Sequence, residues 1–349
     1  MTQRDQLMDT LSEEARAATL MSAPFYAQLV TAMRADVAAE GPTWDLLSRY
    51  AAEPAGEFYA FRALAGVHRL VLAGELPELA RHYRSVGGDG DAQAAWPLLR
   101  QVLAEHTPEL LVTIGHPLQT NETARCAALI GGYLTVARET GLPLSVRALG
   151  ASAGLNLHFD RYRYEAGDAA FGPAGSKVRF VDQWLEGVPP LETSMTVADR
   201  RGCDLDPVDP LSEKGRLDLL ACNWPDDTER LALLRAALEI AAHAPVQVDR
   251  ESADSWIARE LVEREAGATT VVSHSVFWTY LDQAPREAIV SSIELAARKA
   301  TDEMPLAWLR YEIGEEVTSC ELRLTLWPGG NERLLALGGH HLEPVRWLA

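Results

Sequence analysis

The feature that most constrains the fold is residues 144–157, LSVRALGASAGLNL, where a short apolar run breaks into a glycine-containing loop and continues as a helix-like segment. This order predicts a β-strand, a tight turn and a helix. In a chain of alternating strands and helices, such a turn lies at the carboxyl end of a central strand, where Gly150 and Gly154 allow the backbone to approach a bound ligand. We therefore expect the functional site at this turn.

The loop Gly150-Ala151-Ser152-Ala153-Gly154 is compatible with two chemistries. It matches G-x-S-x-G, the nucleophile elbow of the α/β-hydrolases, in which Ser152 would be the nucleophile. It also has the form of a glycine-rich cofactor loop, with Ser152 in place of a middle glycine. The dinucleotide fingerprint G-x-G-x-x-G is not met, because only its first glycine is present, so NAD is not indicated. A plain strand-to-helix turn is the structural alternative.

Composition and charge exclude several classes of protein. The chain has 349 residues, a length typical of roughly two domains, and its net charge of −18 repels nucleic-acid phosphates and anionic membranes. We therefore expect neither partner. The four cysteines are widely spaced and form no C-x-x-C, which indicates neither a metal site nor a disulfide framework. No signal-like or membrane-spanning stretch is present, so a cytoplasmic protein is expected.

The first part of the chain, residues 1–141, predicts a mostly helical region. Phe25, Leu29, Met33 and Val37 recur at helical spacing, as expected for the buried face of a helix. Residues 110–115 form the one strand-like run that we predict in this region. A further helix is expected to run to about residue 140.

A polar group precedes that last helix and has two interpretations. Thr120 or Asn121 could act as a helix N-cap, with the remaining side chains on the surface. Alternatively, the group converges at the helix N-terminus as a substrate-binding cluster, because it holds more amide and charged groups than capping requires. The candidate substrate-binding residues are Gln119, Asn121, Glu122 and Arg125.

From residue 144 onward, short β-branched runs alternate with helical segments, which is typical of an α/β fold with a doubly wound, mainly parallel sheet. Residues 159–190 contain alternating residues and Gly/Pro turns and predict a β-hairpin insertion. Residues 268–277, ATTVVSHSVF, predict a central strand, and 285–300 a helix. Further strands are expected before residues 202–207 and at 246–249, 306–312, 321–327 and 344–348.

This second part resembles the class I S-adenosylmethionine-dependent methyltransferases. The loop ALGASAGLN resembles their first motif, and VADRRGCDLDP (197–207) resembles the segment whose carboxylate binds the ribose of the cofactor, which would be Asp204. VDRESADSW (248–256) resembles the motif that borders the adenine, and VVSHSVFWTYL (271–281) the motif that lines the methyl-transfer site. The resemblance implies cofactor binding by Gly150, Ser152, Gly154, Asn156, Asp204, Ala253, Asp254 and Ser273.

Two departures from the methyltransferase pattern stand out. The acid normally found two residues before the first glycine of the loop is replaced by Ala148. In addition, 50 residues separate Gly154 from Asp204 (204 − 154), whereas the acid of a nucleotide-binding crossover lies about 20 residues on. The hairpin insertion at 159–190 could account for the difference, or Asp204 could belong elsewhere. The whole chain also resembles a bacterial family defined only as a domain of unknown function.

We therefore expect a Rossmann-like, methyltransferase-like domain over residues 142–349, with the helical region 1–141 as a lid or acceptor-binding element. The function that the resemblance implies is S-adenosylmethionine-dependent methyl transfer to a small-molecule acceptor. His274 is the candidate general base, because it is predicted at the carboxyl end of a central strand. The acceptor is expected between residues 119–125 and His274.

Two other functions stay open. One is a protein that binds a cofactor or another ligand on the same fold without turnover. The other is a serine hydrolase that uses Ser152, with an acid and a histidine later in the chain, in the expected order. The candidate acids are Asp204, Asp249 and Asp254, and the candidate histidines are His274 and His340. The insertion could cover the site or mediate formation of a homodimer.

Overall fold

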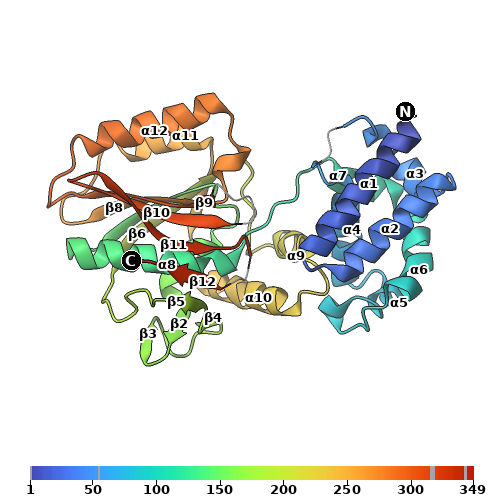
Figure 1. Ribbon diagram of the computed structural model, residues 1–349, viewed down its shortest axis with the longest axis horizontal. Helices are drawn as coiled ribbons and strands as arrows, with labels where there is room; N and C mark the ends of the chain where they lie inside the picture. Colours follow the sequence, from blue (N-terminus) through green and yellow to red (C-terminus); the bar gives the residue numbers. More distant parts are fainter. Residues whose placement is uncertain (1, 54–55, 315–318, 342–343) are drawn as a thin grey trace. The chain divides into compact units, whose positions relative to one another are not determined.

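The computed structural model describes residues 2–53, 56–314, 319–341 and 344–349. The chain forms two compact units (Figure 1). The first unit runs to Thr120 and includes Ser212–Ala232, and the second comprises Asn121–Leu211 and Leu233–Ala349. This division differs from the expected one, because a segment from the second half of the sequence belongs to the first unit. The helix that ends near residue 140 belongs to the second unit.

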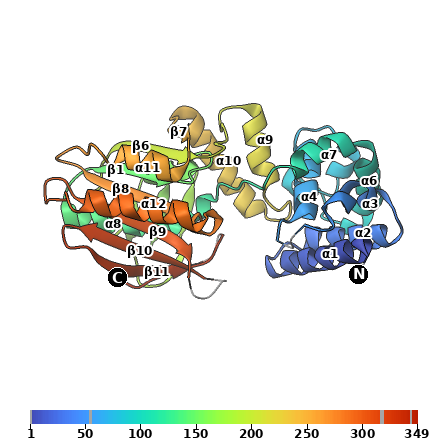
Figure 2. The same cartoon turned by 90° about the horizontal axis from the view of Figure 1, so that it is seen from above.

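Helices build the first unit, and Figure 2 shows them grouped around α4. They are α1 (Gln3–Leu20), α2 (Pro24–Ala38), α3 (Pro42–Leu47), α4 (Tyr59–Leu72), α5 (Pro77–Ala80), α6 (Ala92–Glu105), α7 (Thr107–Ile114) and α9 (Glu213–Ala221), with the 3₁₀ turns η1 (Ser48–Tyr50) and η2 (Arg84–Val86). The predicted face of α2 is buried, including Leu29, Met33 and Val37.

The segment around α9 completes the core of the first unit. Arg69 on α4 donates to Asp218 on α9 at 2.8 Å, and a ring nitrogen of His68 lies 3.3 Å from the carbonyl oxygen of Ala221. Beyond α9, the Trp224 ring packs edge-on against Tyr26. These contacts join residues far apart in the sequence, so the first unit is not a continuous N-terminal domain.

Residues 110–114 are helical, so the strand predicted at 110–115 is wrong. They belong to α7, which has a proline in its first turn, where the missing N–H costs no intrahelical hydrogen bond. Leu110 and Ile114, four residues apart, are both buried, whereas Val112 between them is 66% exposed. A short apolar run does not distinguish a strand from a buried helix. Here the burial of residues four apart shows that the run is helical.

A nine-stranded, mostly parallel sheet forms the centre of the second unit, in the order β5-β12-β11-β10-β9-β8-β1-β6-β7. The strands are β1 (Leu144–Leu149), β5 (Trp184–Glu186), β6 (Val197–Asp204), β7 (Gln247–Arg250), β8 (Thr269–Ser275), β9 (Leu306–Ile313), β10 (Cys320–Trp327), β11 (Asn331–Gly338) and β12 (Val345–Trp347). The mixed α/β class with a mainly parallel sheet is therefore confirmed, and the predicted strands correspond to β1, β6, β7, β8, β9, β10 and β12.

The order of the strands reverses at β1. Strands β7, β6, β1, β8 and β9 are parallel to one another. From β1 the chain passes to β6 and β7 on one side, and then returns to β8 and β9 on the other. In open α/β sheets, ligands bind at such a reversal, beyond the carboxyl ends of the strands.

Helices cover both faces of this sheet (Figure 1). On one face lies α8 (Cys126–Thr140), and on the other lie α11 (Ala253–Glu260) and α12 (Gln283–Ala297). The backbone of α8 approaches the sheet closely, because a Cβ atom at Gly132 would lie 2.3 Å from the Leu309 side chain. A further helix, α10 (Thr228–His243), begins within the first unit and ends within the second.

The inserted region contains a second, three-stranded sheet in the order β3-β2-β4. Strands β2 (Arg163–Ala166) and β3 (Ala169–Phe171) form an antiparallel hairpin, and β4 (Arg179–Val181) pairs in parallel with β2. This sheet follows the 3₁₀ helix η4 (Leu155–Arg161). The insertion thus lengthens the connection between β1 and β6, which explains the 50 residues between Gly154 and Asp204.

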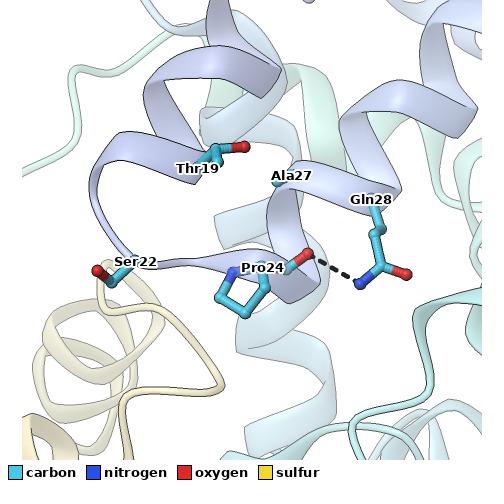
Figure 3. A pocket seen from close by; sticks show the side chains of 5 residues that line it. All are labelled: Thr19, Ser22, Pro24, Ala27 and Gln28. Carbon is cyan, nitrogen blue, oxygen red and sulfur yellow. Dashed lines mark hydrogen bonds between the residues drawn. The ribbon is translucent and has the colours of Figure 1, made fainter.

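Among the described residues, no helix has the length and apolar character needed to cross a membrane. A surface depression of about 500 Å³ lies at the turn between α1 and α2 (Figure 3). It is lined by Thr19, Ser22, Pro24, Ala27 and Gln28, with Gln28 donating to the carbonyl oxygen of Pro24 at 3.3 Å. The lining holds no titratable side chain, so this depression offers no groups for acid–base chemistry.

Candidate functional site

The loop after β1 requires glycine at two positions. Gly150 and Gly154 have φ values of 62° and 73°, in the left-handed region that favours glycine. A Cβ atom at Gly150 would also lie 2.3 Å from the Phe277 ring, and one at Gly154 would lie 2.8 Å from the Val246 side chain. Both glycines are therefore explained by backbone conformation and close packing against the protein.

Two residues other than glycine adopt the same unfavourable conformation at the ends of neighbouring strands. Ser152, after β1, has a φ of 52°, and Val276, after β8, has a φ of 46°. This conformation is rare for residues other than glycine, and especially for a β-branched side chain. Such strain clusters at functional sites, where the surrounding structure maintains it. The reversal point of the sheet is therefore the best candidate site in the second unit.

Asp204 ends β6 and fixes the loop after β1. Its Oδ2 accepts a hydrogen bond of 2.8 Å from the backbone N–H of Ser152, and its Oδ1 accepts one of 3.0 Å from Asp206. The Ala151 N–H donates to the carbonyl oxygen of Cys203 at 2.9 Å. The carboxylate predicted to bind ribose thus lies beside the glycine loop and also positions it.

The Ser152 hydroxyl is buried, and its Oγ forms no hydrogen bond with the part of the chain that the structure describes. A buried polar group without a partner costs free energy, and such a group in a native structure calls for an explanation, such as a ligand or a water molecule. The hydroxyl is therefore suited to contact a bound ligand. No histidine in the described ranges is hydrogen-bonded to it, as a nucleophilic serine would require.

Two of the predicted substrate residues, Asn121 and Glu122, belong to one hydrogen-bonded network with Asn156. Asn121 Oδ1 accepts from the Leu155 N–H at 3.0 Å, and its Nδ2 donates to Asn156 Oδ1 at 3.3 Å. Asn156 in turn donates to the carbonyl oxygen of Glu122 at 3.1 Å. The segment before α8 is thus bound to the segment after the glycine loop.

Glu122 and Arg125 connect this segment to the loop after β11. The buried Glu122 carboxylate accepts from the Ala124 N–H at 3.2 Å, and its Oε2 lies 3.0 Å from Nδ1 of His341. Arg125 donates to the carbonyl oxygen of Ser275 at 3.0 Å and to that of His340 at 3.2 Å. Arg125 therefore bridges the residues that follow β8 and β11.

The geometry of His274 does not suit the predicted general base. Its side chain is fully buried, its Nδ1 lies 2.6 Å from Glu312 Oε1, and its Nε2 accepts from the Trp308 indole at 3.0 Å. The Trp278 ring stacks on it at 5.1 Å. Both ring nitrogens are occupied, so no lone pair is available for an acceptor. His274 is a packed residue that joins β8 to β9.

The other predicted residues are more widely placed. Ser273 points toward α8, because its Oγ accepts from the Tyr133 hydroxyl at 2.9 Å. Ala253 and Asp254 begin α11, directly after β7, as the resemblance implies for residues near the adenine. Gln119 belongs to the first unit, whereas Asn121, Glu122 and Arg125 belong to the second, so the predicted four-residue cluster spans two units.

Two other titratable groups near the loop, His158 and Cys203, are uncharged at neutral pH. Burial and the nearby Arg200 guanidinium lower the pKa of His158 to about 4, so its imidazole is neutral. Burial raises the pKa of the Cys203 thiol to about 12, which excludes a reactive thiolate. No cluster of His, Cys, Asp and Glu in the described ranges could hold a metal ion.

His341 was not predicted, although a topological signal was present. Strand β10 is antiparallel to β9, and β11 is antiparallel to β10, so β11 runs in the same direction as β1 and β8. Its carboxyl end therefore lies at the same edge of the sheet as the glycine loop. The sequence Gly339-His340-His341 follows β11 directly, so recognising the hairpin would have placed both histidines at that edge.

Comparisons with known proteins place the whole chain in a family. None of the curated proteins matches it. A family model described as an uncharacterized protein conserved in bacteria (DUF2332) matches residues 8–347, which covers both units. The chain therefore belongs to this family.

Proposed function

We propose that the protein transfers a methyl group from S-adenosylmethionine to a small-molecule acceptor, using a methyltransferase-like site at the carboxyl edge of the sheet. The observation that carries this proposal is the position of Asp204, whose carboxylate at the end of β6 accepts from the backbone of Ser152 in the glycine loop of β1. A glycine loop beside an acid on the neighbouring strand is the arrangement in which nucleotide-type cofactors bind.

The residues at this edge fit the polar groups of such a cofactor. Asp204 accepts from the backbone N–H groups of Ser152 and Asp206, and an ionised carboxylate, an acceptor with several lone-pair positions, is the group that suits the two donors of a ribose. Asp254 in the first turn of α11 offers a second acceptor, for an amino or hydroxyl donor. The unpartnered Ser152 hydroxyl offers a donor.

The chemistry places modest demands on the protein. Bound S-adenosylmethionine supplies an electrophilic methyl group, and the residues of the chain have to align an acceptor with it and exclude water. In this proposal Asn121 and Asn156 hold the segment before α8 against the glycine loop, which fixes the walls of the site. Positioning therefore accounts for most of the catalysis.

A ligand-binding protein without turnover is the second candidate. Two observations favour it: Ala148 replaces the acid that usually contacts the amino-acid end of the cofactor, and His274 is enclosed with both nitrogens occupied. The serine hydrolase is less well supported. Among the described residues, no histidine is hydrogen-bonded to Ser152 Oγ, as an activated nucleophile would require.

Isothermal titration with S-adenosylmethionine and S-adenosylhomocysteine tests the proposal. We expect micromolar binding by the wild-type protein that is lost in Asp204→Ala and weakened in Asp254→Asn and Ser152→Ala. Asp168→Asn, in the exposed turn between β2 and β3, is a matched control that removes one acidic charge from the same unit. Its affinity should equal that of the wild type.

The opposite result is equally informative. Folded wild-type protein that binds neither compound would contradict the proposal. Labelling of Ser152 by a fluorophosphonate probe, lost in Ser152→Ala, would then favour the hydrolase. Binding without methyl transfer to any acceptor would favour the ligand-binding protein.

A further inference from the structure

We propose that Glu122 and His341 form a general-base pair at the carboxyl edge of the sheet, with Nε2 of His341 as the atom that removes a proton from the acceptor. This inference rests on the proposed function and names the class of acceptor that the site takes. It also replaces His274, which the sequence predicted for the same role.

The two residues come from segments that the topology brings together. Glu122 precedes α8, and His341 follows β11, whose carboxyl end lies at the same edge as the glycine loop. Glu122 Oε2 and His341 Nδ1 are 3.0 Å apart. The Glu122 carbonyl oxygen also accepts from Asn156, which lies shortly after the glycine loop. The pair is thus connected to the candidate cofactor loop through one intermediate side chain.

The two residues differ in exposure, which suits Glu122 to orient the imidazole and His341 to act as the base. The side chain of Glu122 is 2% exposed, whereas that of His341 is 33% exposed. An ionised carboxylate only accepts hydrogen bonds, so neutral His341 keeps its proton on Nδ1 and presents the Nε2 lone pair. Nε2 forms no hydrogen bond with the described residues. A buried acid that orients an accessible imidazole is the arrangement of a catalytic base.

Other contacts hold the loop that carries His341. Arg125 donates to the carbonyl oxygen of the preceding residue, His340, at 3.2 Å, and the Tyr311 hydroxyl donates to that of Gly339 at 2.7 Å. The same arginine donates to the carbonyl oxygen of Ser275. Arg125 is therefore a positioning residue, because it fixes the backbone next to the base relative to the end of β8.

A base of this kind defines the acceptor. An acceptor group that carries a dissociable proton, such as a phenol, an alcohol or a protonated amine, becomes nucleophilic when it loses that proton. The acceptor then forms a bond to the methyl carbon, the carbon–sulfur bond breaks, and its electron pair returns to sulfur. The proton passes to Nε2 of His341 and then to solvent. Thioethers and tertiary amines need no base and are not the expected acceptors.

The tautomer of His341 is the first test, and it requires no acceptor. Long-range ¹H–¹⁵N NMR of the full chain distinguishes Nδ1–H from Nε2–H in each neutral imidazole. We expect His341 with its proton on Nδ1 in the wild type, and loss of that preference in Glu122→Gln. A proton on Nε2 in the wild type would overturn the proposal, because that nitrogen could not act as the base.

Turnover is the second test, with S-adenosylmethionine labelled in its methyl group and a set of small phenols, alcohols and primary amines as acceptors. We expect His341→Gln and Glu122→Gln to lower kcat by about 100-fold or more, the usual contribution of a general base, with cofactor affinity unchanged. The pH dependence of the rate should also be lost in His341→Gln, because a general base has to be deprotonated before it accepts the proton. A merely structural role for His341 would leave that pH dependence in place.

A second histidine–glutamate pair is a matched control. In the first unit, His106 Nδ1 lies 2.9 Å from Glu109 Oε2, and the His106 side chain is 28% exposed. His106→Gln should bind cofactor and turn over like the wild type.

Two outcomes would overturn this proposal while the proposed function stands. One is equal kcat in His341→Gln and the wild type. The other is methyl transfer to a thioether or a tertiary amine, assayed beside the set, without transfer to any phenol, alcohol or primary amine. Failure of the wild type to bind S-adenosylmethionine, or binding without transfer to any acceptor, would instead contradict the proposed function, so the two failures are distinguishable.

Discussion

The backbone N–H of Ser152 donates a hydrogen bond of 2.8 Å to Oδ2 of Asp204, which joins the loop after β1 to the end of β6. This contact holds Ser152 in the left-handed region, with a φ of 52°. One carboxylate thus maintains a strained turn at the point where the sheet reverses. A change at either residue is expected to affect both the stability of the loop and any ligand bound there.

Replacing Asp204 tests the first part of this relationship. Asp204→Asn keeps the size of the side chain but removes the charge that two backbone N–H groups contact. We expect a loss of about 1.5–3 kcal/mol in the free energy of unfolding, the range for hydrogen bonds to charged groups. Urea denaturation followed by circular dichroism measures it. Asp168→Asn should stay within about 0.5 kcal/mol of the wild type, as surface changes usually do.

Replacing Ser152 by glycine should raise stability and weaken binding. Glycine adopts a positive φ without strain, and the substitution also removes a buried hydroxyl without a partner. We expect a gain of about 1 kcal/mol in the free energy of unfolding, the scale of the left-handed penalty. Affinity for S-adenosylmethionine should fall, because Ser152 is a proposed contact.

Ser22 provides the matched control for that experiment. It has a φ of 57° and lies exposed between α1 and α2, in the first unit. Ser22→Gly should relieve a similar strain and leave cofactor affinity unchanged. Unchanged affinity in both variants would exclude a contact between the Ser152 hydroxyl and the cofactor.

The first unit should become less stable as pH rises, through Glu14. Burial raises the pKa of this carboxyl from 4.5 to about 7, opposed by the N–H groups of Ala60 and Phe61 and by Arg62. The folded state therefore binds the proton more tightly than the unfolded state. The stabilisation of the folded state by this tighter proton binding is complete below pH 4.5 and is lost as pH rises to about 7.

The corresponding measurement compares the wild type with Glu14→Gln, in which this titration is absent. A rise in pKa from 4.5 to about 7 corresponds to about 3 kcal/mol of unfolding free energy. The stability of the variant relative to the wild type should therefore increase by about that amount between pH 4.5 and 8. Urea denaturation across this range measures it, and parallel pH profiles would contradict the role of Glu14.

The segment 212–232 should be essential to the first unit. The Trp224 ring lies 5.4 Å from that of Tyr26 and 5.1 Å from that of Phe61, both edge-on. Trp224→Ala should lower the free energy of unfolding by about 2–3 kcal/mol, somewhat less than for a fully buried tryptophan. Near-ultraviolet circular dichroism during denaturation reports on it. Leu20→Ala, at a side chain 77% exposed in the same unit, should have little effect.

Much of the second unit was predictable because its strands are short, β-branched and locally bounded. The runs at β1 and β8 and the glycine loop between strand and helix are local signals. Asp204 was also placed correctly at the end of a strand, despite its distance from the loop in sequence. Hydrophobic periodicity and turn residues predict such strands and loops even when the tertiary fold is unknown.

What the sequence did not predict depends on contacts between distant segments. The role of His274 depends on Glu312 and Trp308, which lie on the next strand of the sheet. The role of His341 depends on the direction of β11 and on a carboxylate 219 residues earlier in the chain. The helix α7 was mistaken for a strand because a short apolar run fits both structures.

The two histidines should therefore respond oppositely to mutation. His274→Ala removes the acceptor of the Trp308 indole and one contact of the Glu312 carboxylate, which keeps the N–H groups of Phe277 and Trp278. It also opens a cavity beneath the Trp278 ring. We expect a loss of about 3 kcal/mol in the free energy of unfolding, because a fully buried side chain and its hydrogen bonds are lost. His341→Gln replaces a one-third exposed ring by an amide that can still donate to Glu122, so it should cost about 1 kcal/mol or less, while abolishing most turnover. Urea denaturation and methyl-transfer assays of both variants measure this contrast. A stable His274→Ala protein that loses only turnover would return the role of general base to His274, and Glu122 and His341 would then form a structural pair.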